Sequence, residues 1–191
     1  MQHSEQPRIE LKHAHYAMDS MRDAETLNEF EEGWKEFLRR IERTWNKMQS
    51  HYGKSPKWTG WQSKYESLRK KDQLLSYLVN ARGAEEHTVD AVVSTNPGGI
   101  TIDPAEGNFM HIESLSLNNG VLKVKSPQKL KIDFILAAIE LLPVVNRGRR
   151  YEVPKEHLGQ AINPQDVSSV AKAAFAFYES ALADAEKFFV K

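Results

Sequence analysis

Residues 23–52 read DAETLNEFEEGWKEFLRRIERTWNKMQSHY, and this stretch decides the fold. From Trp34 onward the apolar residues recur at alternating steps of four and three, which places them along one side of an α-helix. Charged residues fill the other side, and Asp23 and Gly53 are suitable caps at the two ends. The pattern predicts a long amphipathic helix with the apolar stripe Leu27, Trp34, Leu38, Ile41, Trp45, Met48 and Tyr52.

An isolated amphipathic helix is marginal in water, so this stripe needs partner helices. Residues 60–88 supply one partner, and the short connecting loop predicts that it packs antiparallel to the first helix. Asp72 interrupts its apolar pattern and marks either a kink or a break. Residues 164–189 are predicted to form a closing helix, with Pro164 in its first turn and Asn163 as N-cap.

Residues 91–160 have a different character, with turn signals between apolar segments. The Asn-Gly turn at 118–120 lies between alternating segments and predicts a hairpin, and 146–148 is a second turn of hairpin type. Residues 129–145 are rich in Ile, Leu and Val and fit a strand, although 136–142 fits a short buried helix equally well. One small antiparallel sheet is expected.

The expected fold class is α+β: a predominantly α-helical bundle with an inserted small antiparallel β-sheet before the C-terminal helix. Residues 1–191 are expected to form a single domain, in which 23–90 and 163–191 make the bundle and 91–160 the β-rich insertion. Residues 1–22 fit either a short helix or an arm laid on the body.

The composition narrows the possible functions. Lys and Arg number 26, as do Asp and Glu, which disfavours a globally basic nucleic-acid binder but leaves room for a local basic patch. The absence of cysteine excludes disulfide scaffolds, cysteine-ligated zinc, iron–sulfur clusters and a thiol nucleophile. There is neither a long apolar run nor a signal-peptide core, so a cytoplasmic protein without a membrane partner is expected. No metal site and no cofactor are expected.

The most informative motif is DQLLSYLVNARGAEEH at residues 72–87, in which four residues separate Arg82 from His87. This Arg-x4-His pattern near the end of a predicted bundle helix resembles the signature of the HEPN superfamily (higher eukaryotes and prokaryotes nucleotide-binding). The resemblance covers about half of the chain and implies a bundle that dimerises through the motif helices. Many members are metal-independent endoribonucleases and others bind nucleotides. The resemblance therefore implies Arg82 and His87 as a catalytic pair contributed by both protomers; Asn80 and Glu86 are expected to support it.

The same resemblance implies partners for the chain. Hosts often use HEPN proteins in toxin–antitoxin or phage-defence settings. It therefore implies a homodimer that acts on RNA, with an antitoxin protein as a further partner.

The residue types of the motif suit RNA cleavage without metal. The ribose 2′-hydroxyl can attack the neighbouring phosphate, a histidine exchanges protons near neutral pH, and an arginine clamps the phosphate and stabilises its growing charge. On a straight helix, positions five apart differ by roughly 140° and about 7.5 Å of rise. Arg82 and His87 therefore need a composite dimer site or a distortion at Gly83, where the family usually carries a polar residue.

Two basic clusters are weaker candidates for RNA contact. Lys70 and Lys71 lie near Trp58 and Trp61, and basic residues interleaved with aromatic ones bind single strands by charge and stacking. The alternative is a solvated helix face above core tryptophans. The second cluster surrounds the turn at 146–148, where an exposed hairpin tip is the alternative; it comprises Arg147, Arg149 and Arg150.

The predicted function is a metal-independent endoribonuclease acting at a composite dimer site. The alternative is a non-catalytic homodimeric interaction protein, or a protein that binds a nucleotide or RNA without cleaving it. In the interaction alternative Arg82 and Glu86 form ion pairs in the dimer interface. A purely structural interpretation of the motif is also open, in which Arg82 and Glu86 form an i,i+4 ion pair within the helix and His87 caps its C-terminus.

Overall fold

The structure is a computed structural model that describes residues 4–87, 92–135 and 138–190, together with their side chains except those of residues 86, 87, 96 and 138. The chain divides into two compact units. The first, called the helical unit here, consists of Met1–Thr95 and Ile139–Lys191, and the second, called the ribbon unit, is Asn96–Ala138.

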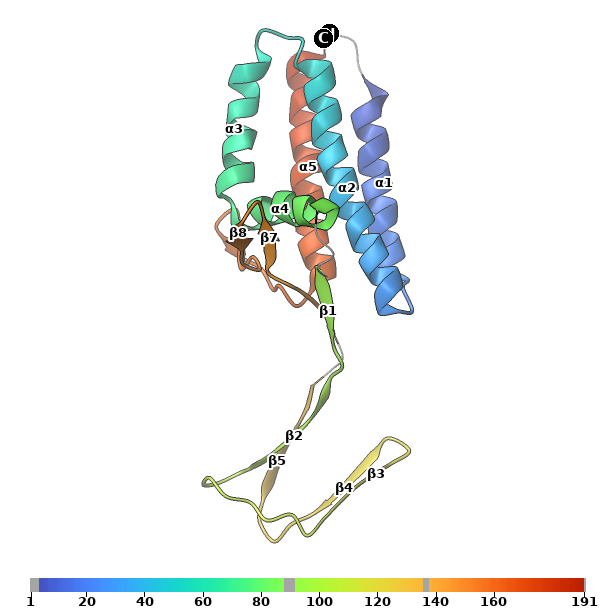
Figure 1. Ribbon diagram of the computed structural model, residues 1–191, viewed down its shortest axis with the longest axis vertical. Helices are drawn as coiled ribbons and strands as arrows, with labels where there is room; N and C mark the ends of the chain where they lie inside the picture. The colour runs from blue at the N-terminus through green and yellow to red at the C-terminus, as the bar shows by residue number, and fades with distance from the viewer. Residues whose placement is uncertain (1–3, 88–91, 136–137, 191) are drawn as a thin grey trace. The chain divides into compact units, whose positions relative to one another are not determined.

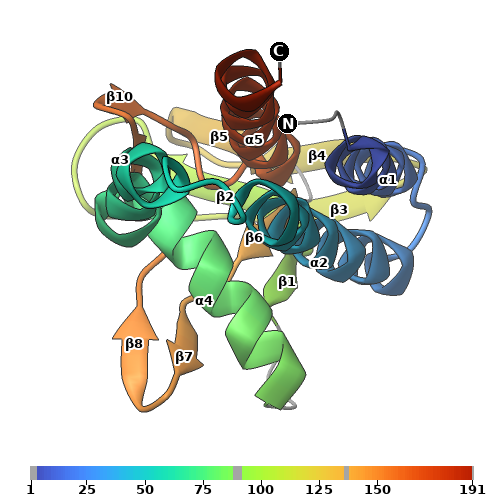
Figure 2. The same cartoon turned by 90° about the horizontal axis from the view of Figure 1, so that it is seen from above.

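Five helices build the helical unit within the described residues: α1 (Glu5–Arg22), α2 (Leu27–Tyr52), α3 (Trp58–Lys71), α4 (Gln73–His87) and α5 (Val167–Phe189). Figures 1 and 2 show α1, α2, α3 and α5 running roughly along one direction, with α4 lying across them. The bundle and its α+β class agree with the sequence expectation, and α3 runs antiparallel to α2 as predicted (Figure 1).

Helix α2 is the amphipathic helix that the sequence predicts, and its apolar stripe from Trp34 to Tyr52 is buried. Its N-terminus differs from the prediction. Thr26, and not Asp23, is the N-cap, because the Thr26 hydroxyl accepts from the Glu29 N–H while the Glu29 carboxylate accepts from the Thr26 N–H. Asp23 instead ends the preceding helix α1, and Gly53 ends α2 as expected.

Residues 5–22, for which the sequence left a helix or an arm open, form α1. The helix lies close to α2 because small residues meet there: Ala14 and Ala17 are buried, and Gly33 faces Met21. The buried Glu10 carboxylate accepts from Arg40 at 2.7 Å, which ties α1 to α2 by an ion pair.

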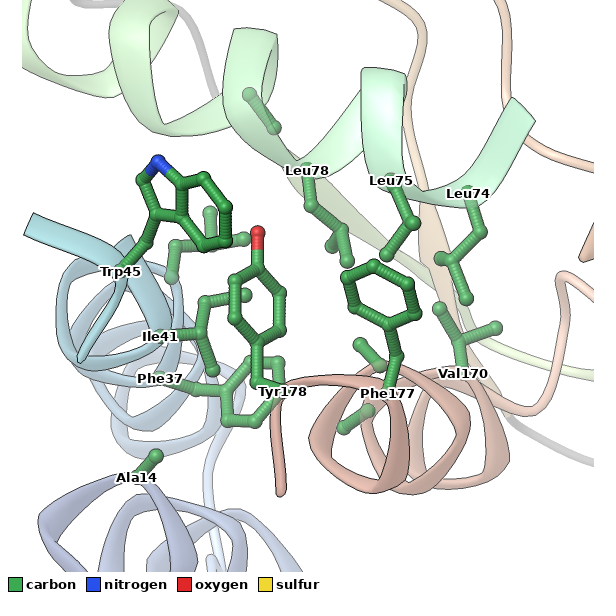
Figure 3. Packing of buried hydrophobic residues seen from close by; sticks show 14 of the residues in the cluster. Ala14, Phe37, Ile41, Trp45, Leu74, Leu75, Leu78, Val170, Phe177 and Tyr178 are labelled. Atoms are coloured by element: carbon green, nitrogen blue, oxygen red, sulfur yellow. The ribbon is translucent and has the colours of Figure 1, made fainter. Parts of the chain in front are cut away.

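The core joins α4 to the long helices. In Figure 3, Leu74, Leu75 and Leu78 of α4 point toward Phe177 and Tyr178 of α5. Aromatic side chains extend the core between α2 and α3. The Trp58 indole is 4% exposed and Trp61 packs on the same core. Trp58 and Trp61, the tryptophans near Lys70 and Lys71, therefore belong to the core. This agrees with the alternative of a solvated helix face above core tryptophans.

Helix α5 begins three residues later than predicted. Asp166, and not Asn163, is its N-cap and accepts from the Ser169 N–H at 2.9 Å. Asn163 uses its side chain in a turn before the helix, where it accepts from the Gln165 N–H. The buried face of α5 carries Phe177 and Phe189; Phe175 is partly buried against the same core, and Phe188 is exposed.

The strands do not form the single sheet that the sequence predicts. In the described residues they make five two-stranded ladders. The strands are β1 (Val93–Asn96) with β6 (Ala138–Leu141), β2 (Gly99–Pro104) with β5 (Leu130–Ile135), β3 (Ser114–Asn118) with β4 (Val121–Lys125), β7 (Val144–Asn146) with β8 (Arg149–Tyr151), and β9 (Glu156–His157) with β10 (Gln160–Ala161).

Both predicted hairpin turns are confirmed. Asn119 and Gly120 have φ values of 49° and 76°, and Arg147 and Gly148 have 51° and 75°. Two successive left-handed residues give the tight two-residue turn whose twist matches the flanking strands. Of the two alternatives for 136–142, strand is correct for Ala138–Leu141. No helix in the described residues is long and apolar enough to cross a bilayer.

Asp72 breaks the second predicted helix into α3 and α4. Its carboxylate caps α4 by accepting from the Leu75 N–H at 2.9 Å, and it also accepts from the Leu158 N–H at 2.7 Å. The His157 ring lies 2.9 Å from the same carboxylate. Asp72 therefore ends α3 through its backbone N–H, while its side chain starts α4 and fixes the β9–β10 hairpin.

We expect Asp72→Asn to lower the free energy of unfolding by about 1–2 kcal/mol at neutral pH, because asparagine keeps one acceptor oxygen for the helix cap but loses the negative charge beside His157 and the second oxygen, which accepts from the Leu158 N–H. Burial alone raises the pKa of Asp72, but hydrogen bonds from Leu158, His157 and Leu75 outweigh it and leave the pKa below its ordinary value. In the unfolded chain an aspartate has a pKa of about 3.9. The stabilisation is therefore fully present above that pH, and it is lost as the pH falls through the lower pKa that Asp72 has in the folded protein. Urea unfolding from pH 3 to pH 7 should show the two proteins converging at the acid end. An equal difference at every pH would contradict this assignment.

Candidate functional site

The β7–β8 hairpin docks on helix α4 through polar contacts. The Tyr77 hydroxyl donates to the Leu142 carbonyl at 2.7 Å, just before the hairpin, and burial raises the pKa of this phenol. The Asn146 amide donates to the Asn80 side-chain oxygen at 3.0 Å, and Asn80 donates in turn to the Ser76 carbonyl. These bonds fix the turn of the hairpin beside the C-terminal half of α4.

Gly83 makes this docking possible. A Cβ atom at position 83 would lie 2.6 Å from Asn146 Nδ2 and 3.1 Å from Asn146 Cγ. Such distances are below normal contact, so a side chain at 83 would displace Asn146. The glycine that departs from the HEPN pattern is therefore the point where the hairpin meets the helix.

A cavity of about 440 Å³ lies between α4 and the hairpin. Three arginines, two side-chain amides and a phenol line it. The lining residues are Glu42, Val79, Asn80, Arg82, Gly83, Asn146, Arg147, Arg149 and Tyr151. The predicted site residue Arg82 thus meets two arginines that are far away in sequence.

Strand alternation explains which hairpin residues line the cavity. Successive side chains of a strand point to opposite faces, so Arg149 and Tyr151 share the cavity side while Arg150 points away. Arg150 donates through Nε to Glu152 at 2.6 Å and does not line the cavity. The Arg149 guanidinium lies 5.2 Å from the centre of the Tyr151 ring, close enough for a cation–π contact.

The charges in the cavity favour an anion. Glu42 is the carboxylate among the described lining residues, and the buried Arg69 forms an ion pair with it. Within the described part of the chain, Arg147 and Arg149 form no ion pair with a carboxylate. Since guanidinium groups bind phosphate oxygens through two parallel hydrogen bonds, the cavity can hold a phosphate group.

The structure brings only some of the predicted site residues together. Asn80 and Arg82 of α4 line the cavity with Arg147 and Arg149. Lys70 and Lys71 do not line it, and Lys70 lies on the surface, 3.8 Å from Glu66. The side chains of Glu86 and His87 lie outside the described residues, so the structure does not test their predicted roles.

Sequence reasoning missed Asn146, Tyr151 and Glu42 as lining residues. The signal for Tyr151 was available, because it stands two positions after Arg149 on a predicted strand and must share its face. Nothing in the sequence pairs Glu42 with Arg69 or Asn146 with Asn80, since those contacts depend on how α2, α3, α4 and the hairpin pack.

Another large hollow in the helical unit has a different chemistry. An open groove of about 740 Å³ between α1 and α2 is lined by several carboxylates, with His13 and Arg40. Among the described residues, no group of three or more His, Asp or Glu side chains is placed to hold a metal ion. The cavity at Arg82 is the stronger candidate because it brings together the predicted site residues Asn80, Arg82, Arg147 and Arg149. Comparisons with family models, curated proteins and solved structures give no match for this chain.

Proposed function

We propose that this chain is a HEPN-like RNA-binding protein that holds RNA phosphates in the cavity at Arg82 and cleaves RNA without a metal ion. The observation that supports the proposal is the shared cavity of Arg82, Arg147 and Arg149. Three guanidinium groups in one hollow suit a polyanion with closely spaced phosphates. They also explain how a chain of zero net charge binds RNA, because the positive charge is local.

The neighbouring groups suit the rest of a nucleotide. The amides of Asn80 and Asn146 offer donors and acceptors to a base edge or a ribose hydroxyl, and bases stack on an arginine or tyrosine plane such as the Arg149–Tyr151 pair. This combination favours single-stranded RNA, whose bases are free to enter a cavity.

In the cleavage step the ribose 2′-oxygen attacks the adjacent phosphorus and the bond to the 5′-oxygen of the next nucleotide breaks. In this proposal the His87 imidazole of one copy takes the 2′-hydroxyl proton, and the protonated His87 imidazole of the other copy gives a proton to the departing 5′-oxygen. Arg82 stabilises the charge that accumulates on the phosphate. The products are a 2′,3′-cyclic phosphate and a 5′-hydroxyl.

The second candidate function is binding of RNA or a nucleotide without cleavage. One observation favours it: none of the described residues that line the cavity is a histidine. In that case the arginines, amides and tyrosine form a complete recognition site and His87 plays no part in it.

The first experiment measures binding of a labelled single-stranded RNA by fluorescence anisotropy in EDTA. We expect Arg147→Ala combined with Arg149→Ala to weaken binding at least about tenfold, because each charged hydrogen bond contributes about 1.5–3 kcal/mol. Arg150→Ala, which removes a positive charge from the same hairpin on its other face, should change binding less than twofold. Equal effects of the two changes would show that the hairpin contributes only general charge, and would refute the cavity as the binding site.

The second experiment follows cleavage of the same RNA in EDTA. For a ribonuclease, His87→Ala abolishes cleavage but keeps binding, whereas Arg82→Ala weakens both. Wild-type protein that binds RNA and leaves it intact at high excess would support the second candidate function. Wild-type protein that does not bind RNA would refute both.

A further inference from the structure

The β7–β8 hairpin lies beside helix α4 and turns one face toward it (Figure 2). Its register pairs Asn146 directly with Arg149, and residues that lie opposite each other in a ladder share a face. Asn146 donates to the Asn80 side chain of α4 at 3.0 Å, so this face is the one that meets the helix. The pairing therefore places Arg149 beside the docked Asn146, and Arg147 follows Asn146 in the turn.

The hairpin also fixes the direction of the Arg149 side chain. The guanidinium lies 5.2 Å from the centre of the Tyr151 ring, which is two positions further along the same face. A guanidinium that lies over a ring keeps its N–H groups at its edge, where they can donate to an anion. A lysine at this position would keep the charge but lose the planar fork of donors.

The charge of the cavity matches a doubly charged anion. Arg147 and Arg149 form no ion pair with a carboxylate within the described part of the chain. The Glu42 carboxylate, which also lines the cavity, is neutralised by its ion pair with Arg69. A phosphodiester within an RNA strand carries a single negative charge, whereas a terminal phosphomonoester carries about −1.5 to −2 near neutral pH. Two guanidinium groups therefore balance the charge of one terminal phosphate.

The oxygen atoms of the two kinds of phosphate differ in the same direction. A phosphomonoester presents three acceptor oxygens, whereas a phosphodiester presents only the two that do not link nucleotides. Each guanidinium fork binds best to a pair of oxygens. Three oxygens give Arg147 and Arg149 a pair each, with one oxygen shared, but two oxygens satisfy a single fork.

The size of the cavity favours the end of a strand over its middle. Its volume of about 440 Å³ is near the lower end of the range of roughly 300–1,000 Å³ that is usual for small-molecule pockets, so it has room for about one nucleotide. Grooves that follow the backbone of a single strand hold roughly 4–16 nucleotides. A strand that enters this cavity with its end needs to place only its last nucleotide inside.

We propose that the cavity at Arg82 recognises the terminal phosphomonoester of a single-stranded RNA, and that Arg147 and Arg149 bind this terminal phosphate. The proposal rests on the proposed function and narrows it from RNA phosphates in general to an RNA end. A phosphate on the 5′ end and one on the 3′ end present the same chemical group, and the test below separates them. Asn80, Asn146 and Tyr151 then contact the last nucleotide.

The test displaces the labelled RNA of the binding experiment with unlabelled oligonucleotides of one sequence. These are 2′-O-methyl oligonucleotides, which stay intact because the attacking hydroxyl is blocked. One carries a 5′-phosphate, one a 3′-phosphate, and one hydroxyl groups at both ends; a fourth, two nucleotides longer with hydroxyl ends, matches the total charge. We expect one or both phosphorylated competitors to act at a concentration at least about tenfold lower than either hydroxyl-ended one, because bidentate charged hydrogen bonds are the strong ones.

Variants of the hairpin assign this preference to the cavity. Arg147→Ala combined with Arg149→Ala should remove the preference, Arg149→Lys should reduce it severalfold, and Arg150→Ala should keep it, because Arg150 does not line the cavity. Equal competition by all four oligonucleotides, or a preference that survives in the double variant, would overturn the proposal and leave the proposed function standing. Labelled RNA that does not bind at all would instead refute the proposed function, so the two failures are distinct.

Discussion

Arg69→Met is expected to lower the free energy of unfolding by about 3 kcal/mol, because removing one partner of a buried ion pair leaves the other charge uncompensated. The Arg69 side chain is 8% exposed and forms an ion pair with the Glu42 carboxylate. It also donates to the Tyr178 hydroxyl at 3.2 Å and lies 4.7 Å from the centre of the Trp45 ring. Methionine keeps the apolar stem and loses all of these polar contacts.

Urea unfolding measures the effect, and two variants control it. Arg22→Met removes an arginine that is paired with Asp19 and Asp23 but is 66% exposed, so it should cost less than about 1 kcal/mol. Adding Glu42→Gln to Arg69→Met should recover about 1 kcal/mol or more, because the orphaned charge is removed. If Arg69→Met and Arg22→Met cost the same, the buried pair does not stabilise the fold in this way.

Arg69→Met should also weaken RNA binding. Glu42 lines the cavity, and Arg69 neutralises its charge. Without Arg69 the carboxylate would repel a phosphate held by Arg82 and its neighbours. The double variant with Glu42→Gln should restore binding, which separates this electrostatic effect from a general loss of folding.

Gly83→Ala is expected to weaken RNA binding about fivefold or more and to lower the free energy of unfolding by about 1–3 kcal/mol, the range for overpacking. Alanine normally stabilises a helix interior by about 1 kcal/mol relative to glycine. Here its Cβ would lie 2.6 Å from the Asn146 amide, so the Asn146 side chain has to move and gives up its hydrogen bond to Asn80, which loosens the turn that carries Arg147. The unfavourable contact should therefore outweigh the gain in helix propensity.

Gly60 provides the matched control. It lies in α3, and a Cβ added there meets nothing within 4 Å. Gly60→Ala should therefore stabilise the protein or leave it unchanged, with RNA binding intact. Combining Gly83→Ala with Asn146→Ala removes the clash and should recover part of the lost stability. A stabilising Gly83→Ala would mean that the hairpin does not dock at this glycine.

The helical part of the fold was the most predictable part of the molecule. The apolar stripe of α2 appears directly in the sequence, because burial on one side of a helix imposes the helical period. The break between α3 and α4 also shows in the sequence, since Asp72 interrupts the apolar pattern there. The ends of helices were less predictable. Asp23, Thr26, Asn163 and Asp166 can all cap a helix, and tertiary packing decides which of them does so.

The strands could be predicted one by one but not as an assembly. The turns at 118–120 and 146–148 follow from local chemistry, because asparagine and glycine tolerate left-handed backbone. Which strand pairs with which depends on distant contacts. The expected single sheet was therefore wrong, and the ladders are separate.

The candidate site was predictable in its parts. Arg82, Asn80, Arg147 and Arg149 were each singled out for their chemistry, but as members of different clusters. Their convergence depends on Gly83, whose missing side chain admits Asn146. The sequence presented this glycine as a departure from the HEPN pattern, and only the packing of the hairpin gives the physical reason for it.

The way the ribbon unit is connected has a consequence for how this protein can change over time. Strands β1 and β6, which pair with each other, carry the chain out of the helical unit and back into it. Because the inserted segment begins and ends on paired strands, it can become longer or shorter, or be replaced, without changing the path of the chain through the helical bundle. Changes in the length or sequence of the ribbon unit should therefore leave the arginine cavity intact, because every described residue that lines it belongs to the helical unit.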